Sequence, residues 1–264
     1  MMWSTVFTII LFSGAAVGRT LHGGRIVNGN NTRIENYPFL VQVDVFQSYG
    51  DWWPSCSANI LKVNWLLSAA HCFEGRDYKP EHRRIRAGTT FKGTGGVIRY
   101  VDYDIKHPDY RVAARYDADI NVVKLLEPLL YSPVIQKATI NVAGNHLPNN
   151  IPVIYAGWGR TDFFGGQPYI LQHVSVYTVD NAMCAEYYRK HNRSDYTVTP
   201  NMICAGLWEE GGKDACTGDS GGPLYTGGVV VGIVSWGHLC AEPFNPGVAT
   251  DVASYTDWIV KTAR

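Results

Sequence analysis

The sequence predicts an all-β protein. Short apolar runs rich in β-branched and aromatic residues alternate with segments of Asn, Gly, Pro and Asp, which is typical of a sandwich or barrel of short strands. These runs are FLVQVDVF, NILKVNWLLSA, GVIRYVDYDI, INVVKLL, IPVIYAGW, LQHVSVYTV and VVVGIVSW. A helical pattern occurs only at the end of the chain, where Tyr255, Trp258 and Ile259 recur at i, i+3 and i+4.

Length, composition and charge limit the class of protein. The 264 residues are enough for one large β-domain or two smaller units. Hydrophobic residues make up 46% of the chain and charged residues 17%, and the 27 Gly and 13 Pro indicate a globular, turn-rich chain. The 23 basic and 23 acidic residues balance, so no excess of charge indicates nucleic acid or an anionic membrane as a partner.

Residues 1–18 are predicted to be a secretory signal peptide. An apolar run from Val6 to Phe12 precedes small residues, with Ala16 and Gly18 suited to the positions just before a cleavage site. The run is too short to span a bilayer, and no later segment of the sequence is apolar for long enough either. We therefore expect a secreted, extracellular protein with no membrane anchor.

The cysteines are expected to form disulfides in an oxidising extracellular compartment. Six cysteines allow fifteen connectivities, and spacing alone does not choose among them. The chain contains no C-x-x-C pair, which argues against a zinc site. Asn30 and Asn192 begin N-x-S/T sequons in polar, turn-like segments, so both are potential glycosylation sites. The cysteines are Cys56, Cys72, Cys184, Cys204, Cys216 and Cys240.

The hexapeptide GDSGGP at residues 218–223 is the sharpest local signal for chemistry. A serine between glycines can occupy a tight turn with exposed backbone N–H groups, which acyl transfer needs to stabilise a developing oxyanion, although an ordinary glycine turn is the alternative. A serine nucleophile also needs a base and a group that orients the base. His71 follows an apolar run and adjoins Cys72, and Asp119 stands at the start of another apolar run.

These motifs together resemble the trypsin/chymotrypsin family of serine proteases. SAAHC, D-I before an apolar run and GDSGGP occur in the family's order, together with RIVNG at 25–29, AGWG at 156–159 and SWG at 235–237. The resemblance extends from Arg25 to the terminal helix and is closest to invertebrate (insect) digestive trypsins, because six cysteines match their minimal disulfide pattern.

The resemblance implies a fold of two six-stranded antiparallel β-barrels with a C-terminal helix and the catalytic residues in the cleft between the barrels. The protease domain would span residues 26–264. The first barrel would cover about 26–133, the second about 134–252 and the helix about 253–264. The implied disulfides join Cys56 to Cys72, Cys184 to Cys204 and Cys216 to Cys240.

The resemblance also implies a role for each catalytic residue. Ser220 would be the nucleophile, His71 the general base and then the general acid, and Asp119 the carboxylate that orients the imidazole. The backbone N–H groups of Gly218 and Ser220 would form the oxyanion hole. Asp117 is a rival for the third role, but the family's aspartate directly precedes the isoleucine and the strand, which favours Asp119.

Activation is expected to follow the family's zymogen route. Residues 19–25 would be a propeptide, removed by cleavage between Arg25 and Ile26. The new amino group of Ile26 would then pair with Asp219 and order the active site.

Specificity for Arg or Lys is implied by Asp214, six residues before the expected nucleophile. A buried carboxylate favours a substrate cation that neutralises it. Gly237 and Gly247 match the glycines that line the family's specificity pocket, and Ser235 and Trp236 are expected to bind substrate beside them. Ala249 departs from the pattern, because the family usually has tyrosine there, and the missing hydroxyl puts the preference between Arg and Lys in doubt.

No cofactor or metal is expected. The segment RAGTTFKGTGGVIRY matches the family's calcium loop but has no Asp or Glu, and calcium prefers carboxylate ligands. We expect a secreted, monomeric endopeptidase acting on proteins and peptides in digestion, with protein inhibitors as further partners. The alternatives are a regulated protease acting on one yolk, cuticle or cascade protein, and a non-catalytic homologue that binds proteins.

Overall fold

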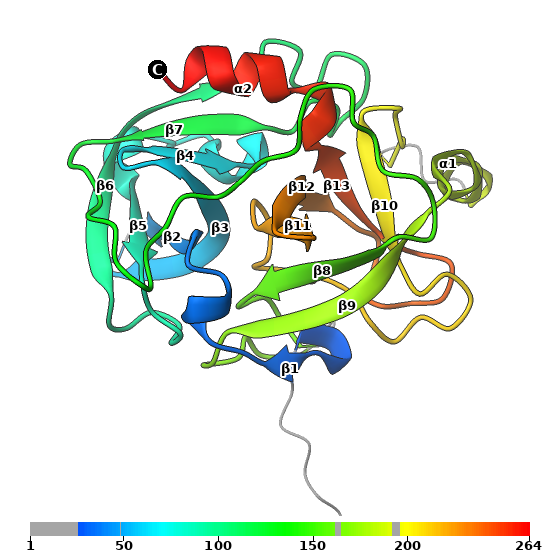
Figure 1. The fold of residues 1–264 in the computed structure, drawn as a ribbon, viewed down its shortest axis with the longest axis horizontal. Helices are drawn as coiled ribbons and strands as arrows, with labels where there is room; N and C mark the ends of the chain where they lie inside the picture. The colour runs from blue at the N-terminus through cyan, green and yellow to red at the C-terminus, as the bar shows by residue number, and fades with distance from the viewer. Residues whose placement is uncertain (1–25, 48, 162–164, 192–195) are drawn as a thin grey trace, which may run out of the picture.

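The computed structural model describes residues 26–47, 49–161, 165–191 and 196–264, and its strands form two β-barrels that lie side by side (Figure 1). The expected fold class, two closed six-stranded antiparallel barrels with few helices, is confirmed. In Figure 1 the barrel of β2–β7 lies on the left and the barrel of β8–β13 on the right. The expected boundary near residue 133 falls in the segment between the two barrels.

The first barrel closes in the order β2-β3-β4-β7-β6-β5, with every pair antiparallel. In β5, buried and partly buried residues alternate strictly, as a strand that packs one face on a core requires. The strands are β2 (Leu40–Phe46), β3 (Trp52–Lys62), β4 (Trp65–Ser68), β5 (Arg83–Ala87), β6 (Val97–Lys106) and β7 (Asn121–Leu125).

The second barrel pairs its strands as β9-β10-β13-β12-β11-β8 and closes through β8 and β9. A short strand, β1 (Asn30–Asn31), adds to the edge of β9. Asn30 therefore lies in a strand and not in the turn that its sequon suggested, although it is exposed. The barrel strands are β8 (Pro152–Gly157), β9 (Gln172–Val179), β10 (Met202–Gly206), β11 (Pro223–Thr226), β12 (Val229–Trp236) and β13 (Gly247–Asp251).

Helices are few and lie outside the barrels. The C-terminal helix α2 (Thr256–Thr262) follows the second barrel but packs on the first, where Lys62 and Trp65 donate to the carbonyl oxygens of Ala263 and Arg264. Short 3₁₀ turns are η1 (Ile26–Asn28), η2 (Ile34–Asn36), η3 (Ala70–Phe73), η4 (Pro80–His82) and η5 (Val252–Ser254).

Helix α1 (Asn181–Lys190) was not expected from the sequence. Its first turn is capped by Asp180, whose side chain accepts the N–H of Met183. Only Cys184 and Tyr188 are buried, so the helix has too narrow an apolar face to show in the sequence pattern. The run NILKVNWLLSA was also expected as one strand, but it turns at residues 63 and 64 and supplies the end of β3 and all of β4.

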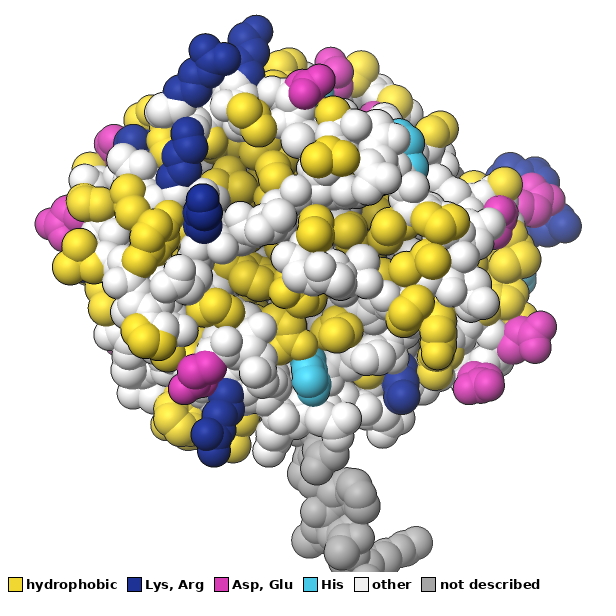
Figure 2. Space-filling view, in the orientation of Figure 1, with side chains coloured by type: hydrophobic (Ala, Val, Ile, Leu, Met, Phe, Trp, Pro, Cys, Tyr) yellow, Lys and Arg dark blue, Asp and Glu magenta, His cyan; other side chains and the backbone are white. Residues whose placement is uncertain are grey.

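Among the described residues, no helix is long and apolar enough to cross a membrane. On the face drawn in Figure 2, uncharged and hydrophobic side chains predominate, and basic side chains form a short row at the upper left.

Candidate active site

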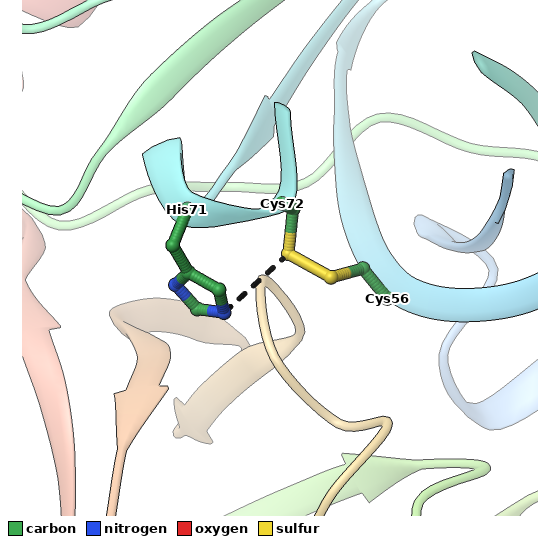
Figure 3. A group of neighbouring side chains, drawn as sticks. All are labelled: Cys56, His71 and Cys72. Carbon is green, nitrogen blue, oxygen red and sulfur yellow. Dashed lines mark hydrogen bonds between the residues drawn. A yellow bond between two sulfur atoms is a disulfide. The ribbon is translucent and has the colours of Figure 1, made fainter. Parts of the chain in front are cut away.

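His71 lies in η3, directly after strand β4 of the first barrel. The neighbouring Cys72 is bonded to Cys56 of β3 with an S–S distance of 2.05 Å, so the disulfide fixes the turn that carries the imidazole (Figure 3). The ring nitrogen Nε2 points back toward the Cys72 sulfur at 3.8 Å. The backbone position of His71 is therefore held covalently to the barrel.

Asp119 holds His71 at two points. Its Oδ2 lies 2.7 Å from His71 Nδ1, and its Oδ1 accepts the backbone N–H of His71 at 2.9 Å. The carboxylate is completely buried. Ser235 of β12 donates its hydroxyl to the same Oδ2 at 2.5 Å, and Thr250 of β13 donates to the carbonyl oxygen of Asp119 at 2.9 Å. The second barrel thus fixes a residue that precedes β7 of the first.

The side chain of Asp117 bonds to a different residue from His71, although Asp117 lies only two residues from Asp119. Its Oδ1 accepts the hydroxyl of Thr199 at 2.6 Å, and the side chain is buried. The carboxylate that contacts the imidazole is that of Asp119, as the family pattern had suggested.

The environment of His71 changes the proton affinity of its imidazole. Burial lowers the pKa of His71, but the charge and hydrogen bond of Asp119 act in the opposite direction and leave the pKa above its ordinary value. The neutral imidazole is the form that can accept a proton from a nucleophile. The arrangement therefore supplies an oriented base that is strengthened by its carboxylate.

The turn that contains Ser220 belongs to the second barrel but is fastened to the first. The carbonyl oxygen of Ser220 accepts the N–H of Ser57 at 2.8 Å, and that of Gly221 accepts the side-chain amide of Asn59 at 3.0 Å. A Cβ on Gly221 would overlap the carbonyl oxygen of Ser57 and the hydroxyl of Ser68. The serine is consequently positioned next to the end of β4, close to where His71 begins its turn.

The backbone N–H groups of Gly218 and Ser220 are available to a ligand. Gly218 and Gly221 have φ of 106° and 78°, the left-handed region that only glycine adopts without strain. Among the described residues, no acceptor takes the N–H of Gly218 or of Ser220, and Ser220 Oγ makes no hydrogen bond to His71. These donors are therefore free to bind an anionic oxygen of a ligand.

Beside Ser220 opens a cavity of about 180 Å³ between β8, β12, β13 and the disulfide Cys216–Cys240. The expected substrate-binding residues Ser235, Trp236, Gly237 and Gly247 all line it. A Cβ on Gly237 would meet nothing closer than 3.8 Å, whereas one on Gly247 would lie 2.5 Å from Asp214 Oδ1. Glycine at these positions keeps the cavity open.

Asp214 lies directly behind Gly247, which lines this cavity. It is 2% exposed, and its Oδ1 has no hydrogen-bond partner among the described residues, while Oδ2 accepts the N–H of Ala241 at 3.2 Å. Burial raises the pKa of Asp214 well above its ordinary value, against the opposing effect of the Ala241 N–H. A buried acceptor of this kind is suited to a cationic ligand.

Asp219, next to Ser220, is also buried. Its carboxylate accepts the N–H groups of Gly159 at 2.7 Å and of Cys216 at 3.0 Å. Burial raises the pKa of Asp219 to about 6, although these two hydrogen bonds oppose the shift. A Cβ on Gly157 or Gly159 would overlap this carboxylate, which explains the glycines of AGWG.

The remaining disulfide joins Cys184 of α1 to Cys204 of β10, so the structure contains the three pairings that the resemblance implied. Arg25 and Asn192 lie outside the described residues, as does the predicted signal peptide. Ile26 begins η1, whose next residues are Val27 and Asn28.

Cys56, His71 and Cys72 are the one group of potential metal ligands that lie close together among the described residues. The two cysteines form a disulfide, so neither offers the thiolate that binds zinc (Figure 3). This group does not fit a metal.

Two functional features of the site were missed from the sequence. Ser235 was expected only to bind substrate, yet its hydroxyl holds Asp119. Tyr116, three residues before Asp119, packs its ring edge-on against His71 and stacks with Trp236. Its place so close to the aspartate was a signal in the sequence, but its ring contacts join the two barrels and depend on the fold.

A buried carboxylate-imidazole pair on the first barrel, with a glycine-bounded serine of the second barrel fastened to the same barrel end, is the arrangement of a serine protease. The family model for trypsin matches residues 26–259. The chain is 38% identical over 235 residues to "Trypsin, alkaline C" of Manduca sexta, which covers 89% of this chain and 90% of that protein. It is 36% identical over 242 residues to "Trypsin alpha" of Drosophila melanogaster, covering 91% and 88%.

A third relative is the "Vitellin-degrading protease" of Bombyx mori, 35% identical over 253 residues, which covers 96% of this chain and 91% of that protein. The chain therefore belongs to the trypsin family. It is a trypsin-like serine endopeptidase that acts on protein substrates.

Proposed function

We propose that this protein is a secreted endopeptidase, made as a zymogen, that hydrolyses peptide bonds after arginine or lysine. Asp214 is the observation that carries the proposal, since its buried carboxylate lies directly behind Gly247, which lines the cavity beside Ser220. In a dry pocket a cation and a carboxylate attract each other far more strongly than in water. An uncharged side chain would leave the carboxylate buried without a partner.

The proposed chemistry assigns each site residue a step. Ser220 Oγ attacks the substrate carbonyl as His71 takes its proton, and the N–H groups of Gly218 and Ser220 bind the resulting oxyanion. His71 then donates its proton to the leaving amine, and water releases the acyl group by the same route in reverse. Asp119 keeps the imidazole oriented and stabilises its charged form, an assignment supported by its two contacts with His71.

Activation by cleavage between Arg25 and Ile26 completes the proposal. It is supported by the burial of Asp219, whose carboxylate accepts hydrogen bonds, among the described residues, only from the backbone N–H groups of Gly159 and Cys216. A new amino group at Ile26 would give this carboxylate a cation and so stabilise the Gly218–Ser220 turn beside it.

Digestion of dietary protein is the proposed physiological role, supported by the similarity to the alkaline trypsins of Manduca sexta. A second candidate role is degradation of a yolk protein. It is favoured by the similarity to a vitellin-degrading protease over 96% of this chain. Secretion is proposed from the apolar N-terminal run and from the three disulfides, which persist in oxidising compartments.

The specificity is tested with matched peptides that differ only in the residue before the cleaved bond. We expect kcat/KM to be highest for Arg and Lys and far lower for Tyr, Leu and Ala. Equal rates for Tyr or Leu and for Arg would contradict the proposal. Digestive and yolk-degrading roles are separated by measuring where the protein accumulates and whether it cleaves purified vitellin faster than casein.

A further inference from the structure

Tyr155 of β8 lines the specificity cavity and carries a phenolic hydroxyl. It lies in β8, is 1% exposed, and lines the cavity together with Ser220 and Gly247. A Cβ on Gly247 would lie 3.1 Å from Tyr155 Oη and 2.5 Å from Asp214 Oδ1. The phenolic oxygen and the carboxylate oxygen therefore both lie close to Gly247, which lines the cavity.

Ala249 explains why the ring of Tyr155 has room there. The resemblance places a tyrosine at position 249, but this chain has alanine, completely buried on β13 in the same apolar cluster as Tyr155. A Cβ on the neighbouring Gly232 would already lie 3.0 Å from the Ala249 Cβ. Because protein interiors are close-packed, a barrel of this size does not hold two tyrosine rings at this level.

We propose that Tyr155 is a specificity-determining residue whose hydroxyl binds the ammonium group of a substrate lysine. This hydroxyl, carried by β8, takes the place in the cavity of the tyrosine hydroxyl that the family usually has at position 249. The inference rests on the proposed specificity for Arg and Lys and names the group that distinguishes them.

The hydrogen-bonding of the hydroxyl suits this role. Tyr155 Oη donates weakly to the carbonyl oxygen of Ala205 at 3.4 Å, and among the described residues nothing donates to it. Its lone pairs are therefore available to a donor in the cavity. Burial, together with the charge of Asp214, raises the pKa of Tyr155, so the hydroxyl stays neutral at alkaline pH.

Lysine needs this acceptor more than arginine does. The ammonium group is a compact donor of three N–H bonds, and the oxygens of Asp214 and Tyr155 lie where two of them could be accepted. Arginine has a longer, planar group that can engage both carboxylate oxygens directly. Removing the phenolic oxygen should therefore weaken recognition of lysine selectively.

The test compares the wild-type protein with Tyr155→Phe, which keeps the ring and removes the hydroxyl. We expect kcat/KM for a Lys peptide to fall about tenfold more than that for the matched Arg peptide, the loss of roughly one hydrogen bond to a charged group. As a measurement that does not depend on acylation, competitive inhibition by n-butylamine should weaken relative to inhibition by benzamidine by a similar factor.

Tyr188→Phe is the matched control. Tyr188 is another fully buried tyrosine, and it donates to the carbonyl oxygen of Pro246 at 2.8 Å, but it does not line the cavity. We expect its loss to leave the Lys-to-Arg ratio unchanged. Should Tyr155→Phe fail to fold, the double variant Tyr155→Val with Ala249→Tyr returns the ring and hydroxyl to β13 and should retain cleavage after Lys.

Two failures are distinguishable. If the wild-type protein does not favour Arg and Lys over Tyr, Leu and Ala, the proposed function is wrong before any variant is made. If it does favour them, but Tyr155→Phe leaves the Lys-to-Arg and butylamine-to-benzamidine ratios unchanged, or Tyr188→Phe shifts them equally, the role of Tyr155 is overturned. Loss of Lys cleavage in a folded double variant would overturn it as well.

Discussion

Asp119 contacts His71 with both of its carboxylate oxygens, one at the ring nitrogen Nδ1 and one at the backbone N–H. A single buried side chain therefore fixes both the imidazole and the turn that carries it. The Oδ2 of Asp119 that faces the ring is also the oxygen to which Ser235 of the second barrel donates. The orientation of the base therefore depends on how the two barrels meet.

Replacing Asp119 with Asn should abolish most activity. We expect turnover to fall about 10⁴-fold, the magnitude known for this substitution in the family, because the amide would hold the imidazole in the wrong tautomer. Asp117→Asn is the control: in the part of the chain that the structure describes, that carboxylate accepts only from Thr199, and it should tolerate the change. Steady-state kinetics on one Arg substrate measures both variants, and the opposite ranking would mean that Asp117 supports the base.

The pH dependence of activity should follow His71. Asp119 raises the pKa of His71 above its ordinary value, so the charged ring is favoured at low pH and the neutral base forms as the pH rises through the raised pKa. We therefore expect kcat/KM to rise with pH and to reach half its plateau above pH ~6.5, the ordinary pKa of histidine. A midpoint below that value in the wild-type protein would contradict the effect of Asp119.

Asp214→Ser should remove the preference for cations. We expect kcat/KM for Arg and Lys peptides to fall at least about 10²-fold, as for a buried charge pair that loses one partner. The reaction of Ser220 with diisopropyl fluorophosphate, which does not use the cavity's charge, should persist and shows that the site is intact. Full cleavage after Arg by this variant would show that another group recognises the cation.

The affinity for benzamidine should depend on pH through the protonation of Asp214. Burial raises the pKa of Asp214, so a cation that binds must displace the proton from any free enzyme in which Asp214 is protonated. The affinity for benzamidine should therefore increase as the pH rises through the pKa of Asp214. Calorimetry in buffers of different ionisation enthalpy should detect proton release; proton uptake on binding would contradict the prediction.

Activation should produce a new N-terminus that pairs with Asp219. Sequencing of the active enzyme should read IVNGN. Pairing would raise the pKa of the Ile26 amine above its usual ~7.7–8.0, so its stabilisation of the active form is present at lower pH and lost as the pH rises through the raised value. Acetylating that amine should abolish activity, and full activity after verified acetylation would refute the coupling.

Chelation should leave the protein unchanged. The loop between β5 and β6 lacks the carboxylates that calcium prefers, and Arg86 donates to the carbonyl oxygen of Gly95 within it at 2.6 Å. We expect the same melting temperature and autolysis rate with and without EGTA. A clear loss of stability on chelation would reveal a calcium site formed by other oxygens.

The sequence by itself determined the features that depend on short segments: the catalytic motifs and most of the strands. The motifs GDSGGP, SAAHC and AGWG could be recognised in the sequence alone. Two of their glycines are required by local packing: a Cβ on Gly221 would overlap Ser57 and Ser68, and a Cβ on Gly159 would overlap Asp219. Runs of β-branched and aromatic residues, bounded by turn residues, predicted most of the long strands, because such side chains favour a pleated, half-buried surface. Strand β5 was missed because three of its five residues are arginines.

Only the tertiary structure decided which distant residues share a site. The hydroxyl of Ser235 and the carboxylate of Asp119 are 116 residues apart in the chain, and local pattern does not indicate that they meet. The sequence placed Tyr155 in a run expected to form a strand, and it showed Ala249 only as the loss of a hydroxyl. Closure of the second barrel brings β8 and β13 to one cavity, and close packing there lets a tyrosine on one strand occupy the space that an alanine on the other leaves.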